Sequence, residues 1–356
     1  MTETIMTIQT LEGLKSYLHA KERTLTESFT FLPKGILARS YPGEKIISAI
    51  SDAMSFVNKV SITRHMVNHV LQKLTVTVRY RPCVRMLAAW KSGRRTQLTV
   101  SEQQALQTAE ALVRSIRARR SNYLEQLYLL YSYVGSTITY RSGRAAQGTD
   151  AYRRYTDCDS VLLRREGNCQ GHSEIMFLCG SMLGFTMGIQ GGESDGGGHC
   201  WNTVSIGRHT YAMDATAKIN GEEKNPTLKN TIYFLMGQRE ADENGLHCTA
   251  LQQVAVLSPT LAPEHDIYRI LGMDFSTADA AARYAWNRYI AGERQVQLRI
   301  SARGVTPETF SAAMKRVASE PALQKQIFSC RSGNLGYYVG GVSQPAALYV
   351  TVEWKA

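Results

Sequence analysis

The sequence contains no apolar run long enough to cross a membrane. Its longest apolar stretch, residues 175–185, is shorter than the roughly 20 residues that a bilayer requires, and it includes two glycines. The N-terminus has no basic segment followed by an apolar one, as a secretory signal would. We therefore expect a cytoplasmic protein without a membrane span, although a secreted form whose signal has been removed would show the same pattern.

Paired cysteines are also lacking. The seven cysteines are scattered along the chain, and none forms a C-x-x-C pair. A disulfide scaffold normally has an even number of cysteines, and a zinc site normally has closely spaced ligands. The pattern therefore favours a reducing compartment, and we expect neither a metal nor a cofactor.

The positive charge is spread along the chain rather than gathered in a binding motif. The net charge is +11, with local clusters at residues 91–95 and 114–120. The second cluster lies on a predicted helix, where arginines commonly face solvent. No RNA- or DNA-binding motif accompanies the clusters, so no specific nucleic-acid partner is expected.

The two ends of the chain resemble each other. Residues 10–31 and 276–301 each read as a helix followed by a strand, and matching helices begin near Ser51 and Ser311. Strands from Leu74 and Leu348 then alternate apolar and polar residues, as half-buried strands do. Thr306 and Pro307 mark one helix start. The pattern predicts two helix–strand–helix–strand units, with chance similarity of short segments as the alternative.

The segment between these units predicts a separate central domain. Residues 85–99 read as a linker, and Ser101 with Gln104 forms a capping-box pattern before a helix. A second helix covers residues 122–134. We expect an N-terminal unit at residues 1–90, a linker and helix at 91–119, a catalytic domain at 120–245 and a C-terminal unit at 246–356. The flanking units would position substrate or bind a partner protein.

Two cysteines in the central domain have different surroundings. Cys179 lies on the apolar face of a predicted helix and is interpreted as a small core residue. Cys169 lies at the start of the same helix, where free N–H groups and the helix dipole stabilise a thiolate and an oxyanion. Gly167 and Gly171 are expected to leave room for a substrate backbone. Cys169 is therefore the candidate nucleophile.

A base and an orienting acid follow on a predicted hairpin. The hairpin turns near Gly207, which brings His199 and Asp214 within a rung or two of each other. The glycine-rich residues 192–198 are predicted to form a mobile loop beside the base. A metal site at Cys169, His172, His199 and Cys200 is the alternative, but adjacent strand residues point to opposite faces and cannot readily share an ion.

These motifs resemble the catalytic core of the transglutaminase-like superfamily. GNCQGHSE, GHCWNTV and YAMDAT occur in the order typical of its bacterial members, within residues 120–236. The resemblance implies an α+β fold: a papain-like transglutaminase core, in which the cysteine-bearing helix packs on an antiparallel sheet, here flanked by two small similar α/β units. It also implies Cys169 as nucleophile, His199 as base and Asp214 as orienting acid.

The sequence departs from the family pattern at several positions. His172 stands where tyrosine is usual, and Cys200 where alanine is usual. The tryptophan that helps to hold the oxyanion in eukaryotic transglutaminases is absent, and no calcium-binding loop pattern is present. The remaining candidates for contacting the oxyanion are Gln170, Tyr133 and Tyr140.

The predicted activity is acyl transfer through a thioester on Cys169, formed from a peptide amide or a glutamine side chain. His199 would protonate the leaving amine and then activate the acceptor, with Asp214 holding the imidazole. Trp201 and Asn202 are expected near the site, with strand packing as the alternative role. Water as acceptor, which is expected more often of bacterial members, gives a peptidase or amidase; an amine gives a cross-linking transglutaminase. The substrate would be a protein or peptide. A non-catalytic binding or scaffold module is the remaining alternative.

Overall fold

The chain forms two compact units. The structure is a computed structural model that describes residues 5–35, 50, 53–54, 56–147, 149–194, 196–216, 233–248, 253–320, 337–344 and 347–354. The first unit lies within Met1–Ala217 and Tyr233–Leu261, and the second within Lys218–Ile232 and Ala262–Ala356. The expected N-terminal unit thus shares one compact unit with the central domain, and the C-terminal unit begins at Ala262 rather than at residue 246.

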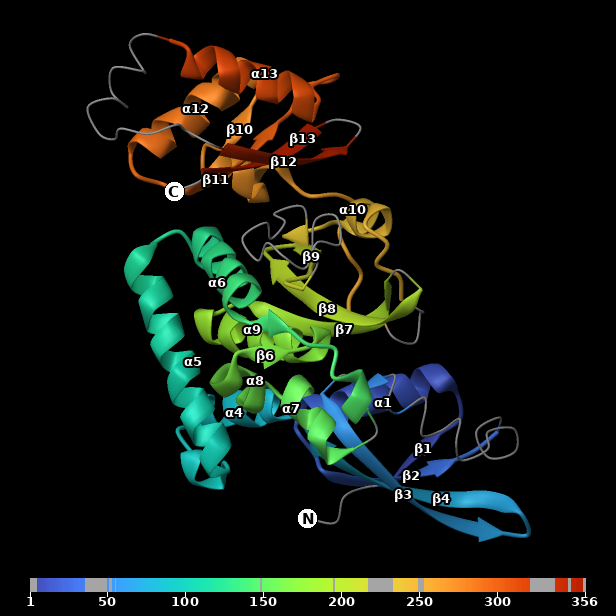
Figure 1. Cartoon of the computed structure of the whole chain (residues 1–356). Coiled ribbons are helices and arrows are strands. Elements are labelled where there is room, and N and C mark those ends of the chain that lie inside the picture. Colours follow the sequence, from blue (N-terminus) through green and yellow to red (C-terminus); the bar gives the residue numbers. More distant parts are fainter. Residues whose placement is uncertain are drawn as a thin grey trace. The chain divides into compact units, whose positions relative to one another are not determined.

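A four-stranded sheet opens the first unit (Figure 1). Its strands occur in the order β1-β2-β4-β3, with β1 parallel to β2 and the other pairs antiparallel. Leu74, Val76, Val78 and Tyr80 are all buried, which confirms the predicted alternation. The elements are β1 (Met6–Ile8), α1 (Leu11–Arg23), β2 (Ser28–Pro33), β3 (Val57–Val67) and β4 (Val70–Tyr80). Most of the helix predicted from Ser51 lies outside the described residues.

The predicted linker is a helix. Residues 82–92 form α4 (Pro82–Ser92), which begins at a proline and buries Cys83, Met86 and Leu87. The apolar residues of this segment recur with helical spacing, and their burial favours a helix. The polar residues that follow them had suggested a linker. The predicted capping box was also misplaced. Thr99 and Glu102, not Ser101 and Gln104, form it at the start of α5.

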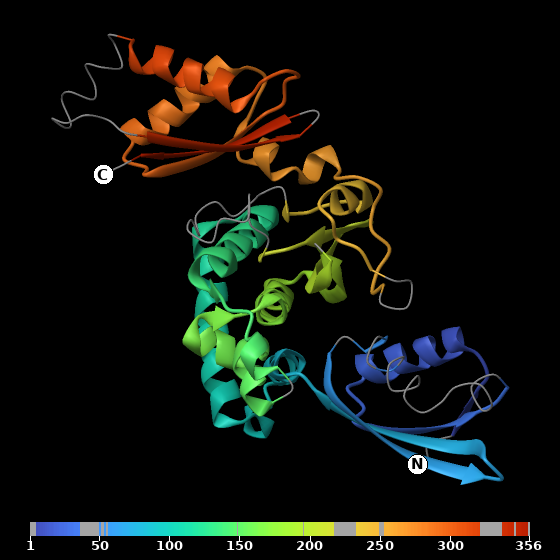
Figure 2. The ribbon, with the colours of Figure 1, turned by 45° about the vertical axis from the view of Figure 1, so that its right-hand side comes forward.

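Helices α5 and α6 flank a central helix, α9, which packs against a three-stranded antiparallel sheet (Figures 1 and 2). The sheet has the order β7-β8-β9. Short elements precede α9, and one helix follows the sheet. The elements are α5 (Val100–Arg119), α6 (Tyr123–Thr137), β5 (Thr139–Tyr140), η2 (Arg144–Ala146), η3 (Asp150–Tyr152), α7 (Arg153–Thr156), α8 (Cys158–Arg164), β6 (Glu166–Gly167), α9 (Cys169–Leu183), β7 (Thr186–Ser194), β8 (Gly197–Ile206), β9 (His209–Met213) and α10 (Gln238–Glu243).

The glycine-rich segment is mostly strand, not the predicted loop. Strand pairing runs from Thr186–Ser205 to Ser194–Gly197. Gly192 lies close to the carbonyl oxygen of His247, where a Cβ would clash at 2.1 Å. Its neighbour Glu193 forms a β-bridge with His247. Glycine is therefore required at position 192 because the backbone of His247 approaches closely. A glycine-rich sequence by itself suggests a flexible loop, but a strand also uses glycine for such an approach.

The second unit repeats the topology of the first sheet. Its strands occur in the order β10-β11-β13-β12, and α12 and α13 cover one face (Figures 1 and 2). Leu348, Val350, Val352 and Trp354 are buried, as the alternation predicted. The fold class predicted from the sequence is confirmed. The elements are η6 (Pro263–His265), α11 (Ile267–Ile270), β10 (Asp274–Phe275), α12 (Ala278–Ile290), β11 (Gln295–Ile300), α13 (Pro307–Ala318), β12 (Tyr337–Gln344) and β13 (Ala347–Trp354).

Across the part of the chain that the structure describes, no helix combines the length and apolarity that crossing a membrane requires.

We predict that the core of the second unit depends on Leu298, which is fully buried in β11 against Trp286, Phe310 and Leu348. Leu298→Ala should lower the free energy of unfolding by about 2–5 kcal/mol, because it removes buried methyl groups and leaves a cavity. Hydrogen exchange of the β11 amides measures the loss. The control Lys315→Ala, at an exposed position of α13, should stay within about 0.5 kcal/mol of the parent. Equal protection in both variants would contradict this core assignment.

Candidate active site

The start of α9 is held by its cap. Asn168 is buried, and its side-chain oxygen accepts a hydrogen bond from the Gly171 N–H at 3.3 Å. Its side-chain amide donates to the Tyr152 hydroxyl at 3.0 Å. Cys169 is the first residue of the helix and is partly exposed. The cap therefore fixes the direction in which the Cys169 side chain leaves the helix.

The glycines beside Cys169 serve packing rather than substrate access, which corrects the sequence interpretation. A Cβ on Gly167 would lie 2.6 Å from a Val161 methyl group, and one on Gly171 would lie 2.7 Å from the Tyr155 carbonyl oxygen. Both glycines are buried. They allow α9 to approach the preceding turn and α8 closely.

The hairpin brings His199 and Asp214 together as predicted. Strands β8 and β9 pair from Ile206–His209 to Asn202–Met213, so Asp214 follows directly at the end of the ladder. The Nε2 atom of His199 lies 2.7 Å from a carboxylate oxygen of Asp214. This hydrogen bond leaves Nδ1 of the imidazole for the nucleophile.

Asp214 is buried, and its second carboxylate oxygen is bound by Thr216. That oxygen accepts hydrogen bonds from the Thr216 N–H at 2.8 Å and from its hydroxyl at 2.6 Å. Burial opposes ionisation, but the contacts with His199 and Thr216 lower the pKa of Asp214. Thr216 was part of the quoted sequence motif, yet the sequence alone assigned it no role.

Cys200 and His199 both act on the thiol of Cys169 and favour its ionised form. The Cys200 contact and then His199, against the opposing effect of burial, lower the pKa of Cys169 to about 5. Burial alone would lower the pKa of His199, but Asp214 and Cys169 raise it to about 10. Between these values the pair is a thiolate and an imidazolium, which is the form that attacks a carbonyl.

Cys200 is the residue that sequence reasoning missed. Adjacent strand residues were expected to point apart, but both Cys200 and His199 lower the pKa of Cys169. The sequence signal was the cysteine that replaces the usual alanine. Cys169 and then burial raise the pKa of Cys200 well above its ordinary value, so Cys200 remains a thiol.

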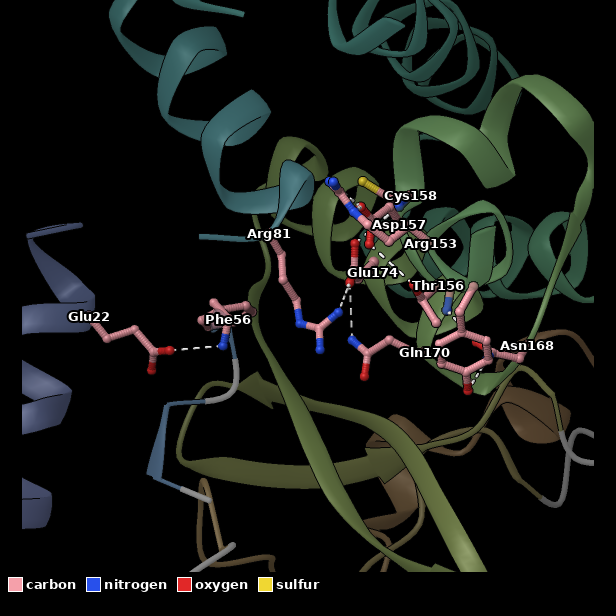
Figure 3. Close-up of polar contacts among 12 residues, drawn as sticks. Glu22, Phe56, Arg81, Arg153, Thr156, Asp157, Cys158, Asn168, Gln170 and Glu174 are labelled. Carbon is pink, nitrogen blue, oxygen red and sulfur yellow. Dashed lines mark hydrogen bonds and ion pairs between the residues drawn. The ribbon is translucent and has the colours of Figure 1, made fainter. Parts of the chain in front are cut away.

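The three candidates for contacting the oxyanion lie in different environments. Gln170 donates its side-chain amide to Glu174, one turn further along α9, at 3.1 Å (Figure 3). Tyr133 is half-buried within α6. Tyr140 is 36% exposed, and burial followed by the charge of Cys169 raises its pKa to about 12. Of the three, Tyr140 is electrostatically coupled to the nucleophile and keeps its proton at neutral pH.

Trp201 and Asn202 lie beside the site in different ways. The Trp201 ring stacks beside His199 with centroids 6.0 Å apart. Asn202 is buried and donates to the carbonyl oxygens of Ser173 and Gly188 at 2.9 and 3.0 Å. Asn202 therefore joins α9 to β7, which matches the strand-packing alternative rather than contact with substrate.

His172 is buried one turn after the nucleophile. Its Nδ1 lies 2.8 Å from the carbonyl oxygen of Asn168, and its Nε2 lies 3.3 Å from that of Ile138. A neutral imidazole has a single N–H, so it donates to one carbonyl at a time. His172 thus links the cap of α9 to the end of α6, and its ring lies 6.1 Å from that of Tyr140.

An ion pair with Arg81, the residue between β4 and α4, supports the same helix. Arg81 donates to Glu174 at 3.0 Å, and the Cys158 N–H and Gln170 complete the shell of this carboxylate (Figure 3). Glu174 is fully buried. Burial raises its pKa to about 7, although Arg81 opposes the shift.

The other cysteine of α9, Cys179, is a core residue. Cys179 is fully buried, and burial raises its pKa to about 12, which confirms the structural interpretation. Among the residues that the structure describes, no group of three or more histidine, cysteine or acidic side chains is arranged to hold a metal ion.

No model of a protein family matches the sequence, and a search of curated proteins finds no match. Three solved structures are similar to it. A TGase shares 14% identity over 78% of this chain and 74% of its own, with a TM-score of 0.32. A proposed cysteine protease from Cytophaga hutchinsonii shares 12% over 44% and 62%, with a TM-score of 0.26. A proposed protease from Parabacteroides distasonis shares 7% over 92% and 65%, with a TM-score of 0.28.

We predict that Cys169 is alkylated by iodoacetamide at mildly acidic pH. Its rate should reach half of the plateau near pH 5 and fall about tenfold for each further unit downward, because the thiol form does not react. Cys248 is exposed, but partial burial of its thiol raises its pKa, so it should react much more slowly than Cys169 at mildly acidic pH. Peptide mass spectrometry after timed labelling separates the two sites. Equal rates at pH 6 would contradict the activated thiolate.

We further predict that Cys200→Ala raises the pKa of Cys169, because the thiolate loses the hydrogen bond from its neighbour. The midpoint of the alkylation profile should move upward. Cys200→Ser, which keeps a donor at the same position, should leave it near the parent value. An unchanged midpoint in the alanine variant would mean that His199, without Cys200, lowers the pKa of Cys169.

Proposed function

We propose that this chain is a cysteine-dependent acyl-transfer enzyme that acts on peptide or glutamine-type amides. The observation that carries the proposal is the contact of the Cys169 thiol with His199, whose other ring nitrogen is bound to the buried Asp214. This arrangement supports the roles of nucleophile, base and orienting acid, and the shifted pKa values of Cys169 and His199 favour the thiolate and imidazolium that thioester formation requires.

The reaction begins when the Cys169 thiolate attacks the amide carbonyl. Free N–H groups in the first turn of α9 and the Tyr140 hydroxyl are proposed to bind the oxyanion. The C–N bond then breaks, and the amine leaves with the proton that the His199 imidazolium donates. The acyl group remains on sulfur as a thioester.

The second half of the reaction regenerates the enzyme. The neutral imidazole of His199 takes a proton from the acceptor, which attacks the thioester and releases Cys169 as a thiolate. Water as acceptor gives a peptidase or amidase, and we propose this outcome from the resemblance to bacterial members of the superfamily. A lysine amine as acceptor would give a cross-linked product.

The test compares the protein with Cys169→Ala in a peptide-cleavage and amine-incorporation assay. The substitution should abolish turnover, and His199→Ala should lower kcat by at least about 10³-fold, because both groups act in one unit. Cys179→Ala is the matched control on the same helix and should keep its activity. Equal signals from parent and Cys169→Ala would overturn the enzymatic assignment. Amine incorporation without cleavage would overturn the choice of water.

A further inference from the structure

A cationic groove lies beside the nucleophile helix. It has a volume of about 510 Å³ and lies between strands β3 and β4 on one side and residues 149–157 on the other. Four cationic residues and two acidic ones line it. They are Lys59, Arg79, Arg81, Arg153, Asp150 and Asp157.

Two of these cations have no anionic partner. Arg153 binds Asp157 at 2.8 Å, and Arg81 binds the buried Glu174 (Figure 3). Lys59 and Arg79 are exposed and form no ion pair with any residue that the structure describes. The unpaired positive charge of the groove therefore resides on Lys59 and Arg79, and Asp150 is an acidic residue of the groove outside the two ion pairs.

Lys59 and Arg79 lie where the repulsion between their charges destabilises the sheet. They are direct partners across the β3–β4 ladder, next to a bulge between Val57 and Lys59. Like charges directly opposite each other on neighbouring strands destabilise a sheet, and bulges often re-aim side chains near functional sites. An anion bound between the two side chains would remove this repulsion.

The second copy of the unit shows that the fold does not require two cations there. Strand β13 repeats the alternation of β4, so the position of Arg79 corresponds to Glu353. Glu353 pairs with Tyr338 across the β12–β13 ladder, where Arg79 pairs with Lys59. The same sheet is therefore built with a different residue pair, and the cations belong to the groove rather than to the fold.

Arg81 adds a donor without a partner at the back of the groove. Its Nη1 atom is bound to Glu174, but its Nε–H is buried and has no hydrogen-bond partner in the described part of the chain. A buried donor without an acceptor costs about 1–3 kcal/mol. Such a donor fits a site that an anionic ligand completes.

Tyr152 links the groove to the start of the helix that carries Cys169. Tyr152 lines the groove, and its hydroxyl accepts a hydrogen bond from Asn168, the residue before Cys169. Burial and then the charge of Cys169 raise the pKa of Tyr152, as expected for a hydroxyl near the thiolate. A chain whose amide lies at Cys169 can therefore continue past Tyr152 into the groove.

We propose that this groove binds the acidic side chains of a peptide whose reactive amide lies at Cys169; the assignment of that amide rests on the proposed function. Lys59 and Arg79 bind the carboxylates of glutamate or aspartate residues near the reactive position. Asp150, also on the groove wall, repels a continuous row of phosphates but accepts hydrogen bonds from peptide N–H groups. The groove thus selects a peptide with a few acidic residues over a nucleic acid.

The test measures binding to full-length Cys169→Ala, which has no nucleophile. Two fluorescent glutamine peptides are compared, identical except that two glutamates in one are glutamines in the other. The acidic peptide should bind about tenfold more tightly at low salt, and added salt should reduce the difference. Lys59→Gln with Arg79→Gln should abolish the preference. The matched control is Arg64→Gln with Lys73→Gln, which removes two exposed cations of the same strands outside the groove and should keep the preference.

Equal binding of the two peptides, or equal loss of preference in both double variants, would overturn the proposal. An oligonucleotide of the same charge that binds as tightly as the acidic peptide would also overturn it. Turnover by the parent separates this inference from the proposed function. A binding preference carried by Lys59 and Arg79 without any thiol-dependent turnover supports the acidic-peptide groove and contradicts only the acyl-transfer assignment.

Discussion

Helix α9 must be buried on nearly every side, and the rest of the first unit is arranged around this requirement. All residues from Gly171 to Gly180 are buried. Neighbouring helices and the β7–β9 sheet surround its middle, and Cys169 lies at its partly exposed start. Burial also places Glu174 where water cannot solvate it. An uncompensated buried carboxylate is costly, and Arg81, the N-cap of α4 directly after β4, supplies the matching charge. The junction of β4 and α4 is therefore tied to the helix that carries the nucleophile.

The same burial explains why the catalytic residues hold their charges. Cys169 and His199 are shielded from solvent on one side, so their mutual attraction is stronger than it would be in water. Asp214 is buried behind His199, and Thr216 occupies its remaining oxygen, which prevents the carboxylate from turning away. Three ionised groups in a row are stable because each one is a hydrogen-bond partner of the next. The nucleophile is thus prepared by packing before any substrate is present.

The sequence predicts those parts of the site that follow from local periodicity. His199 and Asp214 meet because the hairpin register brings them together, and Cys179 is buried because it shares a face with other apolar residues. The contact between Cys169 and Cys200 depends on where the helix start meets the strand, which no periodicity encodes. Similarly, Gly167 and Gly171 were expected to leave room for substrate. Residues from the preceding turn and helix fill that space, which the sequence alone does not reveal. Cys330 lies outside the described residues.

The two similar units show how one fold can carry different surfaces. Their inner faces are constrained alike, because alternating residues of β4 and β13 must fill a core between sheet and helices. Their outer faces meet solvent or a neighbour and are free to differ. In the first unit the directly paired residues Lys59 and Arg79 line the cationic groove, and at the corresponding place in the ladder of the second unit Glu353 pairs with Tyr338. The two similar sheets thus share a packing rule while the residues at this place differ. Specificity for a substrate would then reside in outward-facing residues that contribute little to folding, so it can change without loss of the catalytic core.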